Sequence, residues 1–173
     1  MKKNLFFISL VLCSSCNIIG AGTLSTFQQW TLPVSKEMLD REVADLYKTN
    51  PEYLIPEKWK YLDTWADSGF GSLNGKIFYF KENPEEMYYI SYFEENPDFD
   101  TQKDSKNATI SVRAVNNGSI DRKWRTVDDY KGNSMEEKRI NNRFHEEIIL
   151  KLEKRMGVKS KKQNFWYEFF TRN

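Results

Sequence analysis

Two apolar runs between residues 76 and 93 constrain the fold of this chain more than any other feature of its sequence. Lys76 to Lys81 and Glu86 to Phe93 are rich in aromatic side chains, and Glu82-Asn83-Pro84-Glu85 lies between them. Apolar runs of this length around a turn predict a β-hairpin. Because both faces of these strands are apolar, we expect the strands to be central in a sheet, or one face to bind a partner.

A four-residue loop sets the register of this hairpin. It pairs Phe80 with Met87, and it pairs Phe78 with Tyr89 on the same face. The opposite face then also carries aromatic and branched side chains, so the pattern predicts two buried faces.

A second hairpin is predicted around Asn116-Asn117-Gly118. A two-residue turn there would place branched apolar side chains opposite lysine and arginine. A three-residue loop ending in a left-handed glycine instead pairs Ala114 with Ile120 and Ile110 with Trp124. The hydrophobic pattern therefore favours the three-residue loop.

In this register Arg122 falls in the inward row of the hairpin, among apolar neighbours. A buried guanidinium is costly unless it is paired. It either meets a structural partner or binds an anionic ligand on a face lined by aromatic side chains, which make up 15% of the chain. The candidate binding surface comprises Tyr88, Tyr92, Arg122, Trp124, Asp98 and Asp100.

The C-terminal half predicts a long amphipathic helix. Ser134-Met135-Glu136-Glu137 has the pattern of a capping box. Gly157 stands where a helix commonly ends in a left-handed glycine. Between them an apolar stripe follows helical spacing through Ile140, Phe144, Ile148 and Leu152.

Two shorter helical pieces are predicted before the sheet. Ser35 is a suitable N-cap, and Asn50-Pro51 ends the first piece because the residue before a proline disfavours helix. Pro56 opens the second. We therefore expect an α+β domain over residues 35–173, with a four- to five-stranded antiparallel sheet of two hairpins and the long C-terminal helix packed on one face.

The first residues have the layout of an export signal. Two lysines precede the apolar run Leu5 to Leu12, which as a helix would rise only about 12 Å. A bilayer core of roughly 30 Å needs about 20 residues, so this run is a signal peptide rather than a membrane span.

Small residues then lead into a cysteine, in Leu12-Cys13-Ser14-Ser15-Cys16. This segment resembles the lipobox of bacterial lipoproteins. The resemblance implies that residues 1–15 are removed as the signal peptide and that Cys16 carries a diacylglycerol on its sulfur. Cys13 is the competing site, but Leu12 before it is bulky. An ordinary signal peptide cut nearby remains the alternative.

The same resemblance gives expectations for location. Asn17 follows the cysteine, in place of an aspartate linked to inner-membrane retention, which favours the outer membrane on its periplasmic side. Residues 16–34 are predicted to form a tether whose second half packs down, because Phe27, Trp30 and Leu32 are apolar. The membrane is thus one expected partner, held through acyl chains.

Composition excludes several classes of function. The chain has 26 basic and 25 acidic residues, and loss of Lys2 and Lys3 leaves a net charge of −1. This balance gives no electrostatic basis for binding nucleic acid. Both cysteines belong to the signal region, so the mature domain has no thiol for a disulfide, a metal site or a nucleophile.

No pattern of catalytic residues, metal ligands or cofactor-binding residues is found. His145 is the single histidine, and Ile149 stands where a zincin needs its second one. We expect His145 to be partly buried. In the long acidic connection from Glu94 to Lys106, Asp98, Asp100 and Asp104 have calcium-loop spacing, but Lys103 replaces the required glycine. This connection is predicted to be a solvated loop.

The function expected from these features is a non-catalytic, lipid-anchored envelope protein that binds a protein or an envelope component. The alternatives are an immunity-type lipoprotein that neutralises a periplasmic toxin and, less favoured, a cell-wall hydrolase. The aromatic C-terminal segment from Phe165 to Phe170 is open to three interpretations: a strand, a short helix or a membrane contact.

Overall fold

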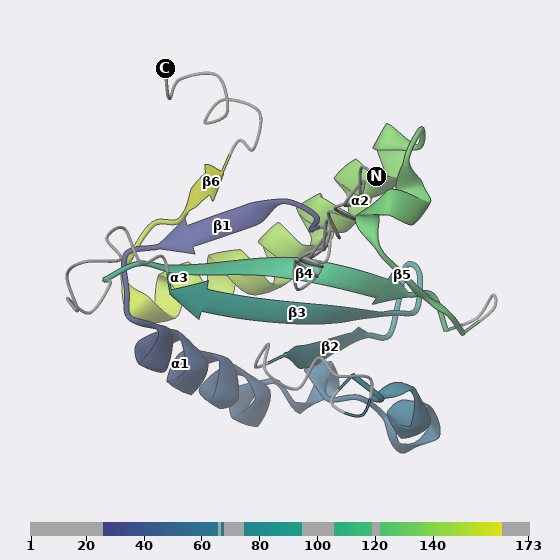
Figure 1. The fold of residues 1–173 in the computed structure, drawn as a ribbon. Helices are drawn as coiled ribbons and strands as arrows, with labels where there is room; N and C mark the ends of the chain where they lie inside the picture. Colours follow the sequence, from purple (N-terminus) through teal and green to yellow (C-terminus); the bar gives the residue numbers. More distant parts are fainter. Residues whose placement is uncertain (1–25, 66, 68–74, 95–105, 119–121, 164–173) are drawn as a thin grey trace, which may run out of the picture.

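The computed structural model describes residues 26–65, 67, 75–94, 106–118 and 122–163 (Figure 1). The fold class is α+β, as predicted, and the sheet has six strands within these described residues. The strands are β1 (Gln29–Leu32), β2 (Lys76–Phe80), β3 (Glu86–Glu94), β4 (Ala108–Asn116), β5 (Trp124–Arg125) and β6 (Lys161–Gln163). The α-helices are α1 (Lys36–Thr49), α2 (Ser134–Phe144) and α3 (Leu150–Met156). A π-helical segment, η6 (His145–Ile149), joins α2 to α3, and short 3-10 helices are η1 (Pro51–Tyr53), η2 (Glu57–Leu62) and η5 (Val127–Tyr130).

The sheet is antiparallel, with the order β2-β3-β4-β1-β6, and β5 adds a short pairing to β4. The N-terminal strand β1 therefore lies inside the sheet, between β4 and β6. Phe27, Trp30 and Leu32 are buried, as their apolar character predicted. Strand β1 pairs its backbone groups with β4 on one side and β6 on the other, so it is part of the folded domain. The domain therefore begins before the predicted boundary at Ser35. The second half of the predicted tether from 16 to 34 thus packs onto the domain, as its apolar side chains indicated, and residues 16–25 lie outside the described residues.

Helix α1 forms where its capping and spacing predict it. The Ser35 hydroxyl accepts a hydrogen bond from the Met38 backbone N–H at 3.2 Å. The helix ends at Thr49, before Asn50 and Pro51. Its apolar stripe of Leu39, Val43 and Leu46 is buried against the sheet.

The long C-terminal helix is also confirmed, with two differences in detail. The predicted stripe of Ile140, Phe144, Ile148 and Leu152 is fully buried. Gly157 takes the left-handed conformation, with φ of 66°. The cap, however, is Asn133, whose side chain accepts from the Glu136 N–H at 3.2 Å, so the predicted box at Ser134 is wrong by one residue. The sequence pattern gave no indication of the π-helical segment.

Apolar side chains are buried on both sides of the sheet. The larger core lies between the sheet and the helices α1, α2 and α3. A smaller cluster on the opposite face is covered by Trp59 of η2, Trp65 and Trp124, and it contains Tyr89, whose ring stacks on Trp65 at 4.0 Å. The prediction of two apolar faces for the first hairpin therefore holds. Strand β2 is nevertheless an edge strand, not a central one.

The predicted register of the first hairpin is wrong by one residue. Phe78 pairs with Tyr88 and Phe80 with Glu86, so the loop has five residues. Because both faces are apolar, a slip of one residue exchanges one apolar face for another, and the hydrophobic pattern does not detect it. In the observed register Glu86 lies on the same face as Tyr88 and Ile90, where its buried carboxylate meets the arginines of α2.

The predicted register of the second hairpin is also wrong. Asn116 pairs with Trp124, and Ile110 pairs with Trp30 of β1 and Tyr92 of β3. Strand β4 thus continues through the asparagine that was assigned to the turn. The sequence contains no local sign that β1, about 80 residues earlier, occupies the side of β4 that a simple hairpin would have used. Ile120, its predicted partner at Ala114, lies outside the described residues.

Candidate functional site

The structure does not assemble the predicted binding surface. Tyr88 and Tyr92 are core residues with exposed fractions of 0% and 2%, so their prediction as surface residues is wrong. The Tyr88 hydroxyl donates to Glu86 at 3.0 Å, and the Tyr92 hydroxyl donates to Asp40. Burial holds the pKa of both tyrosines above the ordinary value, and nearby carboxylates add to this effect. These hydroxyls are structural hydrogen-bond donors.

Arg122 is exposed rather than buried, which corrects the prediction that it faces inward. Its backbone is left-handed, with φ of 58°, and its guanidinium lies over the Trp59 ring at 5.6 Å. Trp124 is half-buried and donates its indole N–H to the Leu62 carbonyl at 2.9 Å. Asp98, Asp100 and Cys16 lie outside the described residues.

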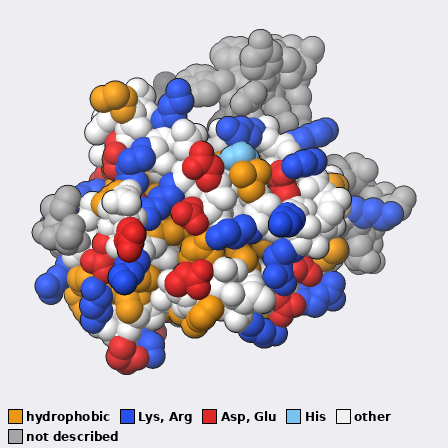
Figure 2. Space-filling model, turned by 180° about the vertical axis from the view of Figure 1, so that it is seen from behind, with side chains coloured by type: hydrophobic (Ala, Val, Ile, Leu, Met, Phe, Trp, Pro, Cys, Tyr) orange, Lys and Arg blue, Asp and Glu red, His pale blue; other side chains and the backbone are white. Residues whose placement is uncertain are grey.

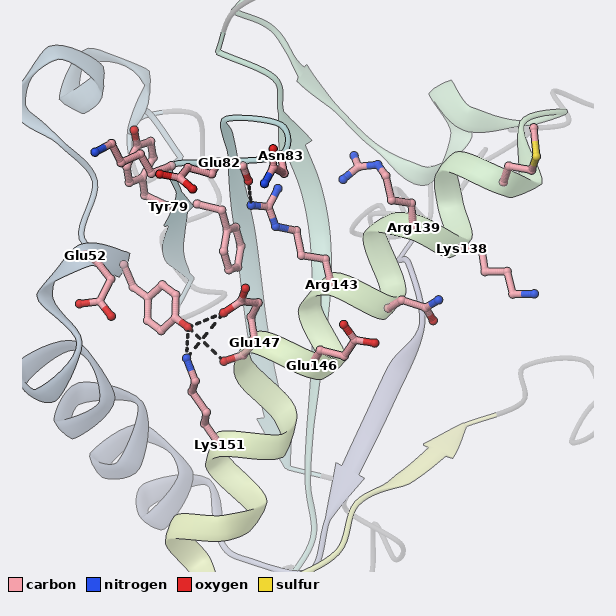
Figure 3. A pocket seen from close by; sticks show the side chains of 15 residues that line it. Glu52, Tyr79, Glu82, Asn83, Lys138, Arg139, Arg143, Glu146, Glu147 and Lys151 are labelled. Carbon is pink, nitrogen blue, oxygen red and sulfur yellow. Dashed lines mark hydrogen bonds and ion pairs between the residues drawn. The ribbon is translucent and has the colours of Figure 1, made fainter.

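The structure instead presents a groove of about 870 Å³ between three segments: the β2–β3 turn, η1 and the C-terminal helix (Figure 3). Its lining combines aromatic side chains with five cationic and four carboxylate side chains. The lining residues are Glu52, Tyr53, Tyr79, Phe80, Lys81, Glu82, Asn83, Met135, Lys138, Arg139, Asn142, Arg143, Glu146, Glu147 and Lys151.

A buried carboxylate beneath the groove ties the helix to the sheet. Glu86 has an exposed fraction of 1% and accepts hydrogen bonds from Arg139 at 2.5 and 3.0 Å and from Arg143 at 3.1 Å. Arg139 also binds Glu136, one helical turn away. Burial lowers the pKa of Arg139, but its bonds to Glu136 and Glu86 raise it by more, so this arginine stays charged.

Arg143 also fixes the shape of the β2–β3 turn. Its guanidinium donates to the Pro84 carbonyl at 2.7 Å and to the Glu82 carbonyl, and it stacks on the Phe80 ring at 4.7 Å. One wall of the groove is therefore held to the other by hydrogen bonds, an ion pair and a cation–π contact.

The opposite end of the groove is closed by a second hydrogen-bonded cluster. The buried Tyr53 hydroxyl donates to the Glu147 carboxylate at 2.8 Å and accepts from Lys151, which also pairs with Glu147 at 3.6 Å. Burial and the bond to Glu147 hold the pKa of Tyr53 above its ordinary value. Glu147 lies in the π-helical segment η6, and π-bulges occur frequently at functional sites.

One stripe of the same helix is not used in this internal pairing. Lys138, Asn142 and Glu146 line the groove, but their side chains make no hydrogen bond or ion pair with any residue that the structure describes. Met135 continues the stripe with an exposed fraction of 82%. In Figure 3 Arg143 points at the β2–β3 turn, whereas Lys138 and Glu146 point away from it.

The face around this stripe carries both signs of charge. Figure 2, the view from behind, shows both basic and acidic side chains over the helical face. Such a face suits a partner that itself carries both signs of charge.

Beside the groove, Glu85 fixes η2 to the hairpin. Its carboxylate accepts from Lys58 at 2.8 Å, from the Tyr79 hydroxyl at 2.6 Å and from the Trp59 indole at 3.2 Å. The bond from Lys58, followed by that from Tyr79, lowers the pKa of Glu85 to about 2. Glu85 is thus ionised throughout the physiological range.

Two further observations concern metals and membranes. No three His, Cys, Asp or Glu side chains among the described residues are grouped so as to hold a metal ion. His145 is half-buried, as expected, and lies parallel to the Trp30 ring at 6.2 Å. Within the same residues, no helix is both long and apolar enough to cross a membrane.

The main residues of the groove were not predicted from the sequence. One signal was available: Glu86 falls in a row of apolar side chains, and Arg139 and Arg143 stand one helical turn apart. No local sequence pattern indicates that η1 packs against the helix and brings Tyr53 to Glu147. Comparisons of the chain with protein-family models, curated proteins and solved structures gave no match.

Proposed function

We propose that this chain is a lipid-anchored protein of the bacterial envelope that binds another protein through the groove between the β2–β3 turn, η1 and the C-terminal helix. The observation that carries the proposal is the groove itself, with rigid paired walls and an unpaired charged stripe. The lipobox-like segment ending at Cys16 supports the anchor and a location at the outer membrane.

The size and rigidity of the groove favour binding. Its volume of about 870 Å³ lies in the range of ligand sites, roughly 300–1,000 Å³. Its walls are joined through Glu86, Arg143 and the Tyr53 cluster before any partner arrives. Binding to such a surface costs less conformational entropy than binding to a mobile one.

The internal pairing of the polar groups at the groove also favours binding over chemistry. Glu86 and Glu147 are held by arginine and lysine in ion pairs, and the Tyr53 hydroxyl is held by its hydrogen bond to Glu147. These groups therefore support the groove wall, and the polar groups left for contact lie along the rim.

The proposal can be tested by photo-crosslinking in cells that express the full chain. A photoreactive amino acid replaces Lys138 at the groove, and in a matched control it replaces Lys48, an exposed lysine of α1 outside the groove. We expect a discrete protein adduct from position 138, and we expect this adduct to be absent from position 48.

The adduct should also depend on the groove's shape. Arg143→Ala removes the bonds to the turn and should reduce the yield of the adduct from position 138 severalfold, while the protein remains present at a comparable level. Equal adducts from both positions, or none from 138, would contradict the proposal.

A further inference from the structure

The chemistry of the unpaired stripe changes from one end of the C-terminal helix to the other. Met135, Lys138, Asn142 and Glu146 follow one another at intervals of three and four residues, so they lie along one side of the helix. From N- to C-terminus the stripe offers an apolar, a basic, an amide and an acidic side chain. A ligand that lies along it meets opposite charges at its two ends.

We propose that the groove takes a polypeptide segment that presents an acidic side chain to Lys138 and a basic side chain to Glu146, with an apolar side chain over Met135. This inference rests on the proposed function and deepens it by giving the chemistry and the orientation of the partner. Charge complementarity of this kind steers association and fixes register.

The internal pairing of the groove supports this assignment. Arg139, Arg143 and Lys151 have carboxylate partners within the chain, at 2.5, 3.1 and 3.6 Å. Lys138 and Glu146 have none among the described residues, although both line the groove. They are therefore the charges of the helix wall that remain for a partner.

The exposure of Met135 is a second, separate observation. It is the most exposed of the large apolar side chains in the described residues, and it lies one turn from Lys138 at the end of the groove. Covering such a side chain with an apolar group of the partner removes apolar area from water, which favours binding.

The helix geometry sets the spacing expected in the partner. Lys138 and Glu146 are separated by eight residues, which corresponds to about 12 Å along the helix axis. An extended segment covers this distance in about four residues, at roughly 3.3 Å each. Different segments that bind the groove should thus share the same spacing and the same order of one acidic and one basic side chain.

The test uses random twelve-residue peptides displayed on phage and the full mature chain carrying Cys16→Ala as bait. We expect the enriched peptides to share one order and one spacing of an acidic and a basic residue. Lys138→Glu and Glu146→Lys should each lower the affinity for a selected synthetic peptide by at least about fivefold, because each change places like charges opposite one another. Raising the salt concentration should lower this affinity as well.

The combined variant K138E/E146K keeps the net charge and should select peptides with the reversed order. In the matched control, D45K/K48D, the reversed residues pair with each other on α1, and selection should be as for the wild type. No enrichment, or the same peptides with K138E/E146K, overturns the inference. A crosslink from position 138 together with either result would leave the groove as the binding site and refute only the assigned peptide chemistry.

Discussion

Glu86 is the buried carboxylate that pairs the sheet with the C-terminal helix. Glu86→Ala leaves two arginines beside the sheet without their buried partner, and such losses cost about 3–5 kcal/mol. We expect a corresponding fall in the free energy of unfolding, measured with urea. The matched control is Glu136→Ala, which removes only the half-exposed partner of Arg139 and should cost much less. Equal losses from the two variants would show that burial of Glu86 is not what matters.

Glu85 predicts how stability depends on pH. Its pKa is lowered to about 2 in the folded protein, from an ordinary value of 4.5. A carboxyl group with a lowered pKa stabilises the fold fully above its unfolded value and loses this contribution as the pH falls to the folded value. Stability should therefore fall between about pH 4.5 and pH 2, and Glu85→Gln should reduce that slope.

The measurement for Glu85 is urea unfolding at several pH values across this window. Glu57→Gln removes another carboxylate of η2, one that pairs only with the exposed Lys60, and serves as the matched control. The interpretation fails if Glu85→Gln and Glu57→Gln change the slope equally.

Gly75 is required by a close approach rather than by a turn. A methyl group on Gly75 would overlap the Tyr89 ring, which stacks on Trp65. Overpacking of this kind costs about 1–3 kcal/mol, so Gly75→Ala should lower the melting temperature. Tyr89→Ala removes the clash, and the double variant should lose less stability than the two single variants together. Strict additivity would argue against the overlap.

At the level of elements, the sequence pattern and the structure assign the N-cap of α2 to different residues. The box at Ser134 predicts that Ser134→Ala weakens the helix, whereas the structure gives the cap to Asn133. We expect Asn133→Ala to lower the free energy of unfolding by about 1 kcal/mol and Ser134→Ala to leave it nearly unchanged. A loss of stability from Ser134→Ala and none from Asn133→Ala would show that Ser134 is the N-cap.

Elements with local signals were predictable from the sequence. The cap at Ser35, the stop at Asn50-Pro51 and the left-handed Gly157 depend on residues within one turn of each other, and each lies where its pattern indicated. The α+β class followed from the same periodicities.

Pairings between distant segments were not predictable in this way. Glu86, which pairs with Phe80 at the end of the first hairpin, is buried against Arg139, more than 50 residues later in the sequence. The position of β1 beside β4 joins segments about 80 residues apart. These contacts have no local periodicity in the sequence, so Tyr88 and Tyr92 were assigned to a surface although they are buried. The groove was missed for the same reason, because it forms where η1, the β2–β3 turn and the C-terminal helix meet.

At the scale of the whole molecule, the helical face combines two tasks along one helix. One stripe of the helix wall, with Arg139, Arg143, Glu147 and Lys151, joins the sheet, the turn and η1. The neighbouring stripe remains available to a partner. The fold therefore holds the groove rigid without consuming its rim charges, which is what a binding protein requires.

At the same scale, the proposed location of the protein in the envelope depends on the lipid anchor at Cys16. The direct measurement is the mass of the N-terminal peptide of the mature protein, isolated from membranes. We predict that the chain begins at Cys16 with a diacylglycerol on its sulfur, and that Cys16→Ala, unlike Cys13→Ala, abolishes lipid labelling. A mature chain that begins elsewhere, or an unmodified Cys16, would contradict the account.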